Sequence, residues 1–193
     1  MRISLSQVAR EARACTLCRR HLPLGPRPVF RARRSARLLI VGQAPGRRVH
    51  ESGIPWNDPS GDVLREWLAL EREAFYDTSR VAIVPMGLCY PGTVDSADLP
   101  PRPECAPRWQ SRFGSALPDI RLTLLVGQYA HRFYLPDSKK PTLGETVKAF
   151  REYLPEFFVL PHPSWRNRAW ILRNPWFTRN VIPELRKRVK AAI

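Results

Sequence analysis

The chain has 193 residues, of which 32 are Lys or Arg and 17 are Asp or Glu, so its formal net charge is +15. This length predicts one domain, covering residues 1–193, with a substantial core. The charge favours an anionic partner, of which nucleic acid is the commonest; an acidic membrane surface and a solvated basic face are the alternatives. No segment approaches the roughly 20 consecutive apolar residues that a membrane span needs.

The N-terminal part of the sequence predicts a helix, a basic connection and a buried strand. Apolar residues at helical spacing from Leu5 to Ala12 mark the inner face of the helix, which runs into Cys15. Residues 19–37 are rich in Arg and Pro and predict an irregular connection. The continuous apolar run Leu38–Val41 is typical of a strand in a parallel sheet.

Glycine and proline punctuate the next segment, so residues 43–59 are predicted to form a long loop. Ser60 is then expected to cap a helix. Three more strands are predicted at residues 81–84, 122–126 and 157–160, with a loop over the Pro-rich residues 90–104. Further helices are expected at residues 105–113, after Gly127, at 143–152 and at 175–193.

Four strands that alternate with helices predict an α/β fold, a three-layer α/β/α sandwich with a central four-stranded parallel sheet. Ligands of such sheets bind at the carboxyl ends of the strands. The turn at Gly42 and the loop at His162 both begin at such ends. These two segments are therefore the first candidates for a functional site.

The four cysteines fall into two pairs, Cys15 with Cys18 in a C-x-x-C and Cys89 with Cys105 sixteen positions apart. The N-terminus lacks the apolar core of a signal peptide, which predicts a cytoplasmic protein. Thiols stay reduced there, so an even number of cysteines indicates a metal site. Four thiolates suit an iron–sulfur cluster or zinc, and four unligated thiols are the third interpretation.

Three other segments carry residues suited to chemistry. The turn Gly42-Gln43-Ala44-Pro45-Gly46 is either an anion-binding loop or simply a tight turn, and it lacks the residues of a P-loop. Trp56, flanked by Pro55 and Asn57, either stacks on a base or packs in the core. His162 follows a strand directly, where a histidine either stabilises a leaving group or is satisfied within its loop.

In this order the segments resemble the uracil-DNA glycosylase superfamily, and most closely its iron–sulfur branch, family 4. That branch has a C-x-x-C, a G-E/Q-A-P-G turn, a G-x-P-F segment, a G-x-x-A turn and a histidine motif. The matching stretches here are Cys15–Cys18, Gly42–Gly46, Gly53–Trp56 with Gly61, Gly127–Ala130 and His162–Ser164. The spacing of Cys89 and Cys105 equals that of the family's last two cluster cysteines, and the resemblance covers about residues 12–185.

The resemblance implies an enzyme of base excision repair, a monofunctional uracil-DNA glycosylase. Such an enzyme flips uracil out of single- or double-stranded DNA and hydrolyses its N-glycosidic bond, leaving an abasic site. The resemblance also implies a 4Fe–4S cluster held by the four cysteines, with zinc as the less favoured occupant. We further expect a monomer with activity at the bacterial nucleoid.

Residue roles follow from the same resemblance. Gly42, Gln43 and Ala44 would line the floor of the base pocket, and Trp56 would stack on the base where the family uses Phe. His162 would stabilise negative charge on the departing uracilate. The DNA contacts would come from four residues of the following segment: Ser164, Trp165, Arg166 and Arg168.

The sequence departs from the family at three positions. Ala44 occupies the place of the water-activating Asp of the best-known members, which family 4 also lacks. Val49 and His50 stand in place of the family's acidic pair, so His50 becomes a candidate to position water, with Glu51 and Asp58 as the nearby carboxylates that could serve instead. The uracil-reading Asn would fall near Pro85, which leaves the backbone near Met86 or the side chain of Asn57 to read the base.

These departures leave two alternatives open. One is a cluster-containing DNA-binding protein that keeps the fold without catalysis. The other is a protein that traps uracil-DNA covalently through a histidine, for which His50 would be the candidate.

Overall fold

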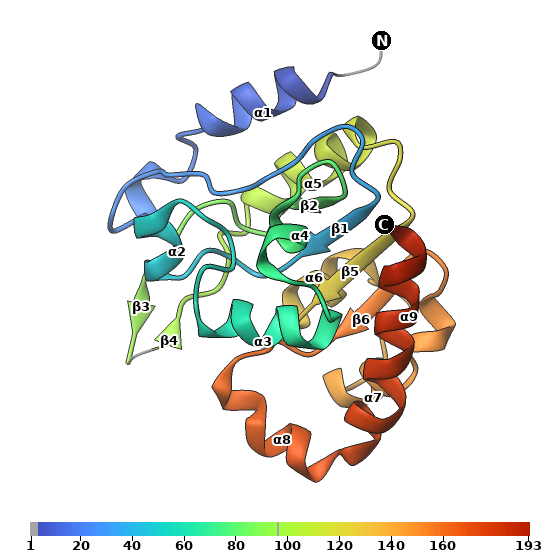
Figure 1. Cartoon of the computed structure of the whole chain (residues 1–193). Coiled ribbons are helices and arrows are strands. Elements are labelled where there is room, and N and C mark those ends of the chain that lie inside the picture. Colours follow the sequence, from blue (N-terminus) through green and yellow to red (C-terminus); the bar gives the residue numbers. More distant parts are fainter. Residues whose placement is uncertain (1–3, 96) are drawn as a thin grey trace.

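The computed structural model describes residues 4–95 and 97–193. At its centre is one parallel sheet with the strand order β2-β1-β5-β6 (Figure 1). Its strands are β1 (Leu38–Val41), β2 (Val81–Ile83), β5 (Leu122–Val126) and β6 (Phe157–Leu160). All residues of β1, β2 and β5 are buried, as the continuous apolar runs in the sequence predicted for strands covered on both faces.

Helices cover both faces of the sheet. The connection from β1 to β2 contains α2 (Arg47–Ser52), α3 (Pro59–Leu68) and α4 (Arg72–Tyr76). The connections to β5 and β6 contain α5 (Cys105–Ala116), α6 (Gln128–Tyr134), α7 (Leu143–Lys148) and a 3₁₀ turn at Phe150–Tyr153. From β1 the chain moves to β2 at one edge of the sheet, and from β2 it moves the opposite way, past β1 to β5 and then β6. Because crossovers between parallel strands are right-handed, these two directions of movement place the helices before β2 and the helices after β2 on opposite faces of the sheet. The predicted three-layer α/β/α architecture is confirmed.

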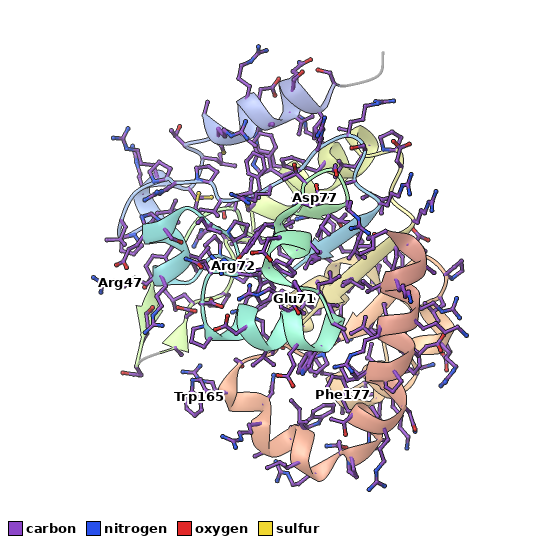
Figure 2. The ribbon with its side chains drawn as sticks, in the orientation of Figure 1. Arg47, Glu71, Arg72, Asp77, Trp165 and Phe177 are labelled. Atoms are coloured by element: carbon purple, nitrogen blue, oxygen red, sulfur yellow. The ribbon has the colours of Figure 1, made fainter. Side chains whose placement is uncertain are left out.

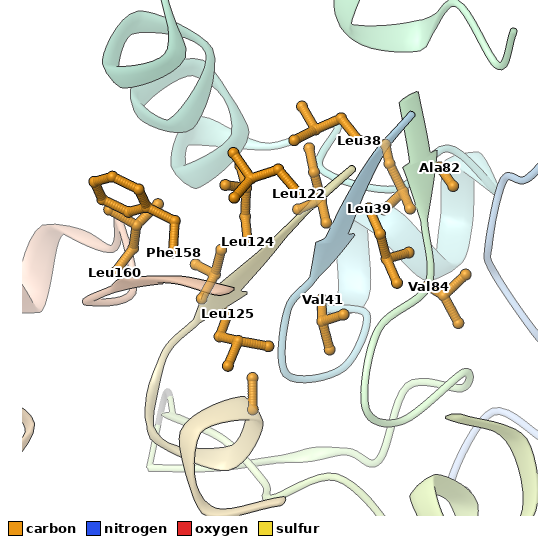
Figure 3. Packing of buried hydrophobic residues seen from close by; sticks show 14 of the residues in the cluster. Leu38, Leu39, Val41, Ala82, Val84, Leu122, Leu124, Leu125, Phe158 and Leu160 are labelled. Carbon is orange, nitrogen blue, oxygen red and sulfur yellow. The ribbon is translucent and has the colours of Figure 1, made fainter. Parts of the chain in front are cut away.

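The core lies between the sheet and these helices. Figure 3 shows the strand side chains meeting there, among them Leu39, Val41 and Leu124. The last helix, α9 (Ile182–Ala192), packs beside α3 (Figure 1), and Trp67 of α3 meets Phe177 edge to face with ring centroids 5.0 Å apart. No helix in the described part of the chain is long and apolar enough to cross a membrane.

The N-terminal helix forms as predicted and packs against α5. This helix, α1 (Leu5–Arg13), buries Val8, Ala9 and Ala12, and the hydroxyl of Ser4 caps it by accepting from the N–H of Gln7. The connection that follows contains a 3₁₀ turn at Arg19–His21. It pairs briefly with the edge of the sheet at Ile83.

The segment predicted as a loop over residues 43–59 contains a helix, α2. Gly46 precedes it, and Gly53, in the left-handed region with φ 68°, ends it. Its buried residues are Val49 and His50 alone, too few to give a periodic signal. The cap of α3 is Asp58 instead of Ser60, because the Asp58 Oδ1 accepts from the Gly61 N–H at 2.8 Å.

Three other segments differ from the predictions. The loop over residues 90–104 contains a small hairpin, β3 (Thr93–Val94) paired with β4 (Ala97–Asp98). An additional short helix, α8 (Arg168–Arg173), follows a 3₁₀ turn at Trp165–Asn167. The predicted helix over residues 175–193 begins with a π-helical turn, Phe177–Val181, before α9. Such short elements lack the repeated apolar spacing on which sequence prediction depends.

Candidate active site

A cleft of about 350 Å³ opens where the carboxyl ends of the four parallel strands meet. Each strand supplies part of its lining: Pro85 follows β2, residues 42–46 follow β1, Gln128 and Tyr129 follow β5, and His162 follows β6. Open α/β sheets bind their ligands at this edge. The cleft is therefore the candidate active site.

Trp56 and His162 lie next to each other in this cleft. Their ring centroids are 5.5 Å apart and their planes are inclined by 30°, which is the stacked geometry of aromatic contacts. The sequence predicted both residues as parts of one site although they are far apart in the chain. The structure brings them together at the rim of the sheet.

Two glycines make room for Trp56. A Cβ on Gly42 would lie 2.7 Å from Cζ2 of the indole, and a Cβ on Gly61 would lie 1.8 Å from the carbonyl oxygen of Trp56. Trp56 itself has φ 58°, a left-handed conformation that is uncommon for a bulky residue. Such backbone conformations persist where the surrounding structure holds them in place.

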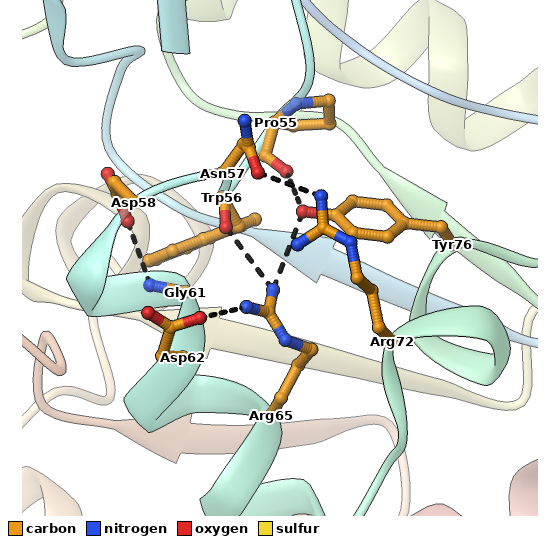
Figure 4. Close-up of polar contacts among 9 residues, drawn as sticks. All are labelled: Pro55, Trp56, Asn57, Asp58, Gly61, Asp62, Arg65, Arg72 and Tyr76. Atoms are coloured by element: carbon orange, nitrogen blue, oxygen red, sulfur yellow. Dashed lines mark hydrogen bonds and ion pairs between the residues drawn. The ribbon is translucent and has the colours of Figure 1, made fainter. Parts of the chain in front are cut away.

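Polar contacts from α3 and α4 hold this backbone (Figure 4). The buried Arg65 donates from Nη1 to the carbonyl of Trp56 at 3.3 Å, and its Nη2 pairs with the carboxylate of Asp62. The Tyr76 hydroxyl donates to the carbonyl of Pro55 at 2.9 Å. The loop that carries the indole is thus fixed on both sides of Trp56.

The next two residues of the loop, Asn57 and Asp58, also form hydrogen bonds. The amide oxygen of Asn57 accepts from the Arg72 Nη2 at 2.9 Å, while Asp58 caps α3 through Gly61 (Figure 4). Within the part of the chain that the structure describes, Asp58 lines the cleft and Asn57 does not. Burial raises the pKa of Asp58, and the nearby charge of Asp98 raises it further.

His162 occupies a partly buried position with little charge around it. Burial lowers its pKa to about 4, so the imidazole is neutral at neutral pH. Its backbone carbonyl accepts from the Asn167 side chain at 2.7 Å. Gly127, with φ 89°, lies beside it, since a Cβ added at Gly127 would be 3.5 Å from the Cβ of His162. A neutral imidazole held in this way can donate a hydrogen bond without carrying a full charge.

Most of the predicted site residues line the cleft. They are Gly42, Gln43, Ala44, Trp56, Asp58, His162, Ser164, Trp165 and Arg166. His50, Met86 and Arg168 are outside the lining that the described residues form. His50 is buried on α2 with its ring 5.9 Å from that of Tyr90, and its Nδ1 lacks a hydrogen-bond partner among the described atoms.

Sequence reasoning missed several residues that the cleft contains, notably Asp98, Gln128 and Tyr129. Asp98 lies in the β3–β4 hairpin, and its carboxylate approaches Gly46. Nothing in the sequence around Asp98 shows that the Pro-rich segment folds back over the first strand. Gln128 and Tyr129 follow Gly127 directly, so the rule that ligands bind at strand ends could have identified them.

A large apolar side chain projects from the edge of the cleft. Trp165 is 80% exposed, and Figure 2 shows its indole extending away from the body of the molecule. The guanidinium of Arg166 lies 5.5 Å from the centroid of that ring. Arg168 begins α8 immediately beyond. Exposed aromatic and basic groups thus stand together beside the cleft mouth.

Comparison with known families identifies the relatives of this fold. The family model described as the uracil DNA glycosylase superfamily matches residues 30–186, well over half of the chain. The chain belongs to the uracil DNA glycosylase superfamily. This membership supports a DNA glycosylase type of function, with DNA as the bound substrate.

A solved structure agrees with the superfamily fold. It is a solution NMR structure of a protein from Methanosarcina acetivorans, provisionally described as a uracil DNA glycosylase. The match has a TM-score of 0.51 and 16% sequence identity, and it covers 86% of this chain and 98% of the other. At this identity the similarity supports the shared fold alone.

The four cysteines surround one small cavity whose lining shares no residue with that of the cleft. Cys15, Cys18, Cys89 and Cys105 line it together with apolar residues, and all four are free thiols. The N–H of Leu88 donates to the Cys105 Sγ at 3.2 Å. Burial raises the pKa of Cys89 to about 11 and that of Cys105 to about 12. Both thiols would stay protonated at neutral pH without a cation to stabilise the thiolates.

This donor set fits a metal cluster. Four sulfur ligands are the usual set for iron–sulfur clusters, and N–H donors to sulfur are typical around them. Among the described residues, no group of three or more His, Cys, Asp or Glu side chains is arranged to hold a metal ion.

Proposed function

We propose that the protein is a DNA glycosylase that excises uracil from DNA by hydrolysing the N-glycosidic bond. The observation that carries this proposal is the contact between Trp56 and His162 in the cleft at the carboxyl edge of the sheet. Superfamily membership supports the reaction class. The net charge of +15 supports binding to a polyanion.

The flipped base would stack on the indole of Trp56. Because the two rings are already in contact, with 5.5 Å between their centroids, no base fits between them. A base on the indole therefore meets the imidazole of His162 at its edge. There the neutral imidazole donates a hydrogen bond to the oxygen on which negative charge develops as the base departs.

The carboxylates that line the cleft complete the proposed mechanism. As the base leaves, the sugar becomes positively charged, and Asp58 and Asp98 are negative groups placed to stabilise it and to orient the attacking water. The Asp58 Oδ1 already accepts from Gly61, so its second oxygen is the one directed to chemistry. Asp58 is a better candidate for this role than His50, which lies outside the lining.

The segment after His162 would hold the DNA. The exposed Trp165 is suited to fill the space that the flipped nucleotide leaves in the stack, with Ser164 and Arg166 beside it at the mouth of the cleft. Arg168 on α8 would contact a phosphate. Rates measured with uracil in single- and double-stranded DNA would show which form this segment prefers.

The decisive assay uses oligonucleotides that contain one uracil, followed by alkali treatment and a denaturing gel. Strand cleavage after alkali is the result expected for a glycosylase. Unchanged DNA that is retarded on a native gel would favour a binding protein without catalysis. A band that stays shifted under denaturing conditions would indicate covalent trapping, which the position of His50 outside the cleft lining does not support.

A test of Asp58 separates its structural role from its chemical role. Asp58→Asn keeps a side-chain oxygen for the Gly61 N–H, so the free energy of unfolding should stay nearly constant. Loss of the charge should slow excision at least about tenfold. Asp58→Ala also removes the cap and should lower stability by about 1 kcal/mol. If Asp58→Asn excises uracil as fast as the wild type, the side chain is only a helix cap.

We also propose that Cys15, Cys18, Cys89 and Cys105 hold a 4Fe–4S cluster. Bound there, it would supply structural cross-linking: it would tie the end of α1 to the loop after β2 and to the first turn of α5. This role suits a segment that contains little apolar core of its own.

Cys89→Ala tests this site. The purified wild type should contain iron and sulfide and absorb in the visible range, whereas the variant should lose both properties and unfold at a lower temperature. The readouts are metal and sulfide analysis, the absorption spectrum and the melting curve. Colourless wild-type protein with one zinc ion per chain would contradict the proposal.

A further inference from the structure

A group of arginines lies at the opposite edge of the sheet from the cleft. Arg80, Arg37 and Arg121 are the residues directly before β2, β1 and β5, which are neighbours in the sheet. The cleft, in contrast, is lined by residues at and beyond the carboxyl ends of the strands. The length of the strands, roughly 10–17 Å at about 3.3 Å per residue, therefore separates these arginines from the cleft.

Backbone hydrogen bonds hold these three residues side by side. The N–H of Arg37 donates to the carbonyl of Arg80 at 2.9 Å, and the N–H of Arg121 donates to the carbonyl of Arg37 at 2.7 Å. The residues that follow them are paired in register across the three strands. Because neighbouring strands are about 4.8 Å apart, the three side chains leave the backbone in a row about 10 Å long.

Two more arginines, Arg33 and Arg34, precede β1 in the same segment as Arg37. The Ser35 hydroxyl between them and Arg37 donates to the carbonyl of Ser79 at 3.2 Å, which ties this segment to the one before β2. All five arginines are exposed, and none belongs to an ion pair between residues that the structure describes. We call this group the arginine edge: Arg33, Arg34, Arg37, Arg80 and Arg121.

The carboxylates near the arginine edge are fewer than its arginines. They belong to the same segments or to the residue before β6: Asp77, Asp119 and Glu156. Hydrogen bonds from Ser79 lower the pKa of Asp77, and the charges of two arginines of the edge lower it further. Asp77 is thus already hydrogen-bonded, and the edge keeps a net positive charge.

The arginine edge has no apolar anchor. Among the described residues, no exposed large hydrophobic side chain belongs to residues 33–37, 77–80 or 119–121. Protein interfaces and membrane-bound surfaces commonly bury aromatic or aliphatic side chains. Guanidinium groups alone suit phosphate, whose oxygens accept pairs of N–H donors. The chemistry of this edge therefore favours a nucleic acid backbone as the partner.

We propose that the arginine edge binds the phosphates of a second DNA segment while a first segment occupies the cleft. A single duplex does not reach both places, because DNA is stiff over about 150 bp and would have to turn back around the molecule. One protein chain then bridges two duplexes. The inference goes beyond the proposed excision and requires the cleft to bind DNA, not to cleave it.

The test variant carries Arg37→Gln, Arg80→Gln and Arg121→Gln together. The hydrogen bonds of the row are made by backbone atoms, so this variant should keep the wild-type melting temperature. The matched control removes the same number of charges from exposed positions of the C-terminal segment, with Arg173→Gln, Arg179→Gln and Lys187→Gln. It separates the effect of place from the effect of net charge.

The experiment measures how much of a labelled, undamaged duplex the protein captures on beads that carry another undamaged duplex. The wild type and the control should capture it in complexes of one chain and two duplexes, as the mass from sedimentation shows. The edge variant should capture at least about tenfold less, and the dependence of log K on log salt should weaken by about 0.9 for each lost contact. Its excision of uracil from a short single strand should match the wild type.

Four results would overturn the inference. They are equal capture by the wild type and the edge variant, an equal loss in the control, two protein chains in each bridge, and a loss of binding to phosphatidylserine vesicles in place of DNA. If the edge variant does not fold, the wild-type complex decides, and one duplex per chain overturns the proposal. A wild type that bridges duplexes but releases no uracil would contradict the proposed function and leave this inference standing.

Discussion

Replacing His162 with alanine is expected to slow the excision of uracil by about 100- to 1000-fold, the usual cost of removing one donor that stabilises developing negative charge. The affinity for DNA should change little, because the exposed basic and aromatic groups beside the cleft remain. Single-turnover rates and gel-shift affinities on the same uracil-containing duplex measure the two effects separately. His21→Ala is the control, since His21 is an exposed histidine of a 3₁₀ turn outside the cleft. Nearly normal turnover in His162→Ala would remove this residue from the mechanism.

The pH dependence of the same group provides a further readout. Burial lowers the pKa of His162 to about 4, so its ring stays neutral as the pH falls through 6.5. The rate advantage of the wild type over His162→Ala should therefore show no titration step near pH 6.5. An unfolded chain binds this proton first, so the contribution of His162 to folding stability is complete above pH 6.5 and is lost toward pH 4.

Gly61→Ala is expected to cause the largest loss of stability among single methyl additions at the site. The new Cβ would lie 1.8 Å from the carbonyl oxygen of Trp56 and 2.6 Å from its carbonyl carbon. These are backbone atoms held by Arg65, so they cannot turn aside as a flexible side chain would. We expect a loss of about 3 kcal/mol or more in the free energy of unfolding, together with reduced excision because Trp56 must move.

Gly114→Ala is the matched control for this prediction. Gly114 lies on the exposed side of α5, and a Cβ there would meet nothing within 4 Å. This variant should gain about 0.5–1 kcal/mol, because alanine favours the helix over glycine. Urea denaturation measures the free energy of unfolding of both variants. Similar values would show that the backbone at Trp56 can move to accommodate the added methyl group.

The sheet and the two ends of the active site could be predicted from the sequence because they depend on strong local signals. Leu38–Val41 is apolar throughout, and His162 follows a strand directly, so the strand-end rule places His162 and Gly42 at one edge. The cap of α3 could also have been identified correctly. Pro59 prefers the first position of a helix, which makes Asp58 the cap and leaves Ser60 inside.

Other features of the site depend on tertiary contacts that leave no periodic pattern. Asp98 reaches the cleft because a hairpin of two-residue strands folds over Gly46. The N–H of Met86 is not free to contact the base, because it donates to the carbonyl of Gly42, a residue from another part of the chain. His50 looked suited to position water, yet α2 buries it away from the cleft. Residue type alone cannot reveal such placements.

The support of Trp56 by Arg65 and Tyr76 has a consequence for how a nucleotide enters. The indole is immobilised before any ligand arrives, so no conformational entropy of this loop has to be lost on binding. The energetic cost of entry then falls on the DNA, which must give up the stacking of one nucleotide. Lesions that already stack poorly should accordingly be captured fastest.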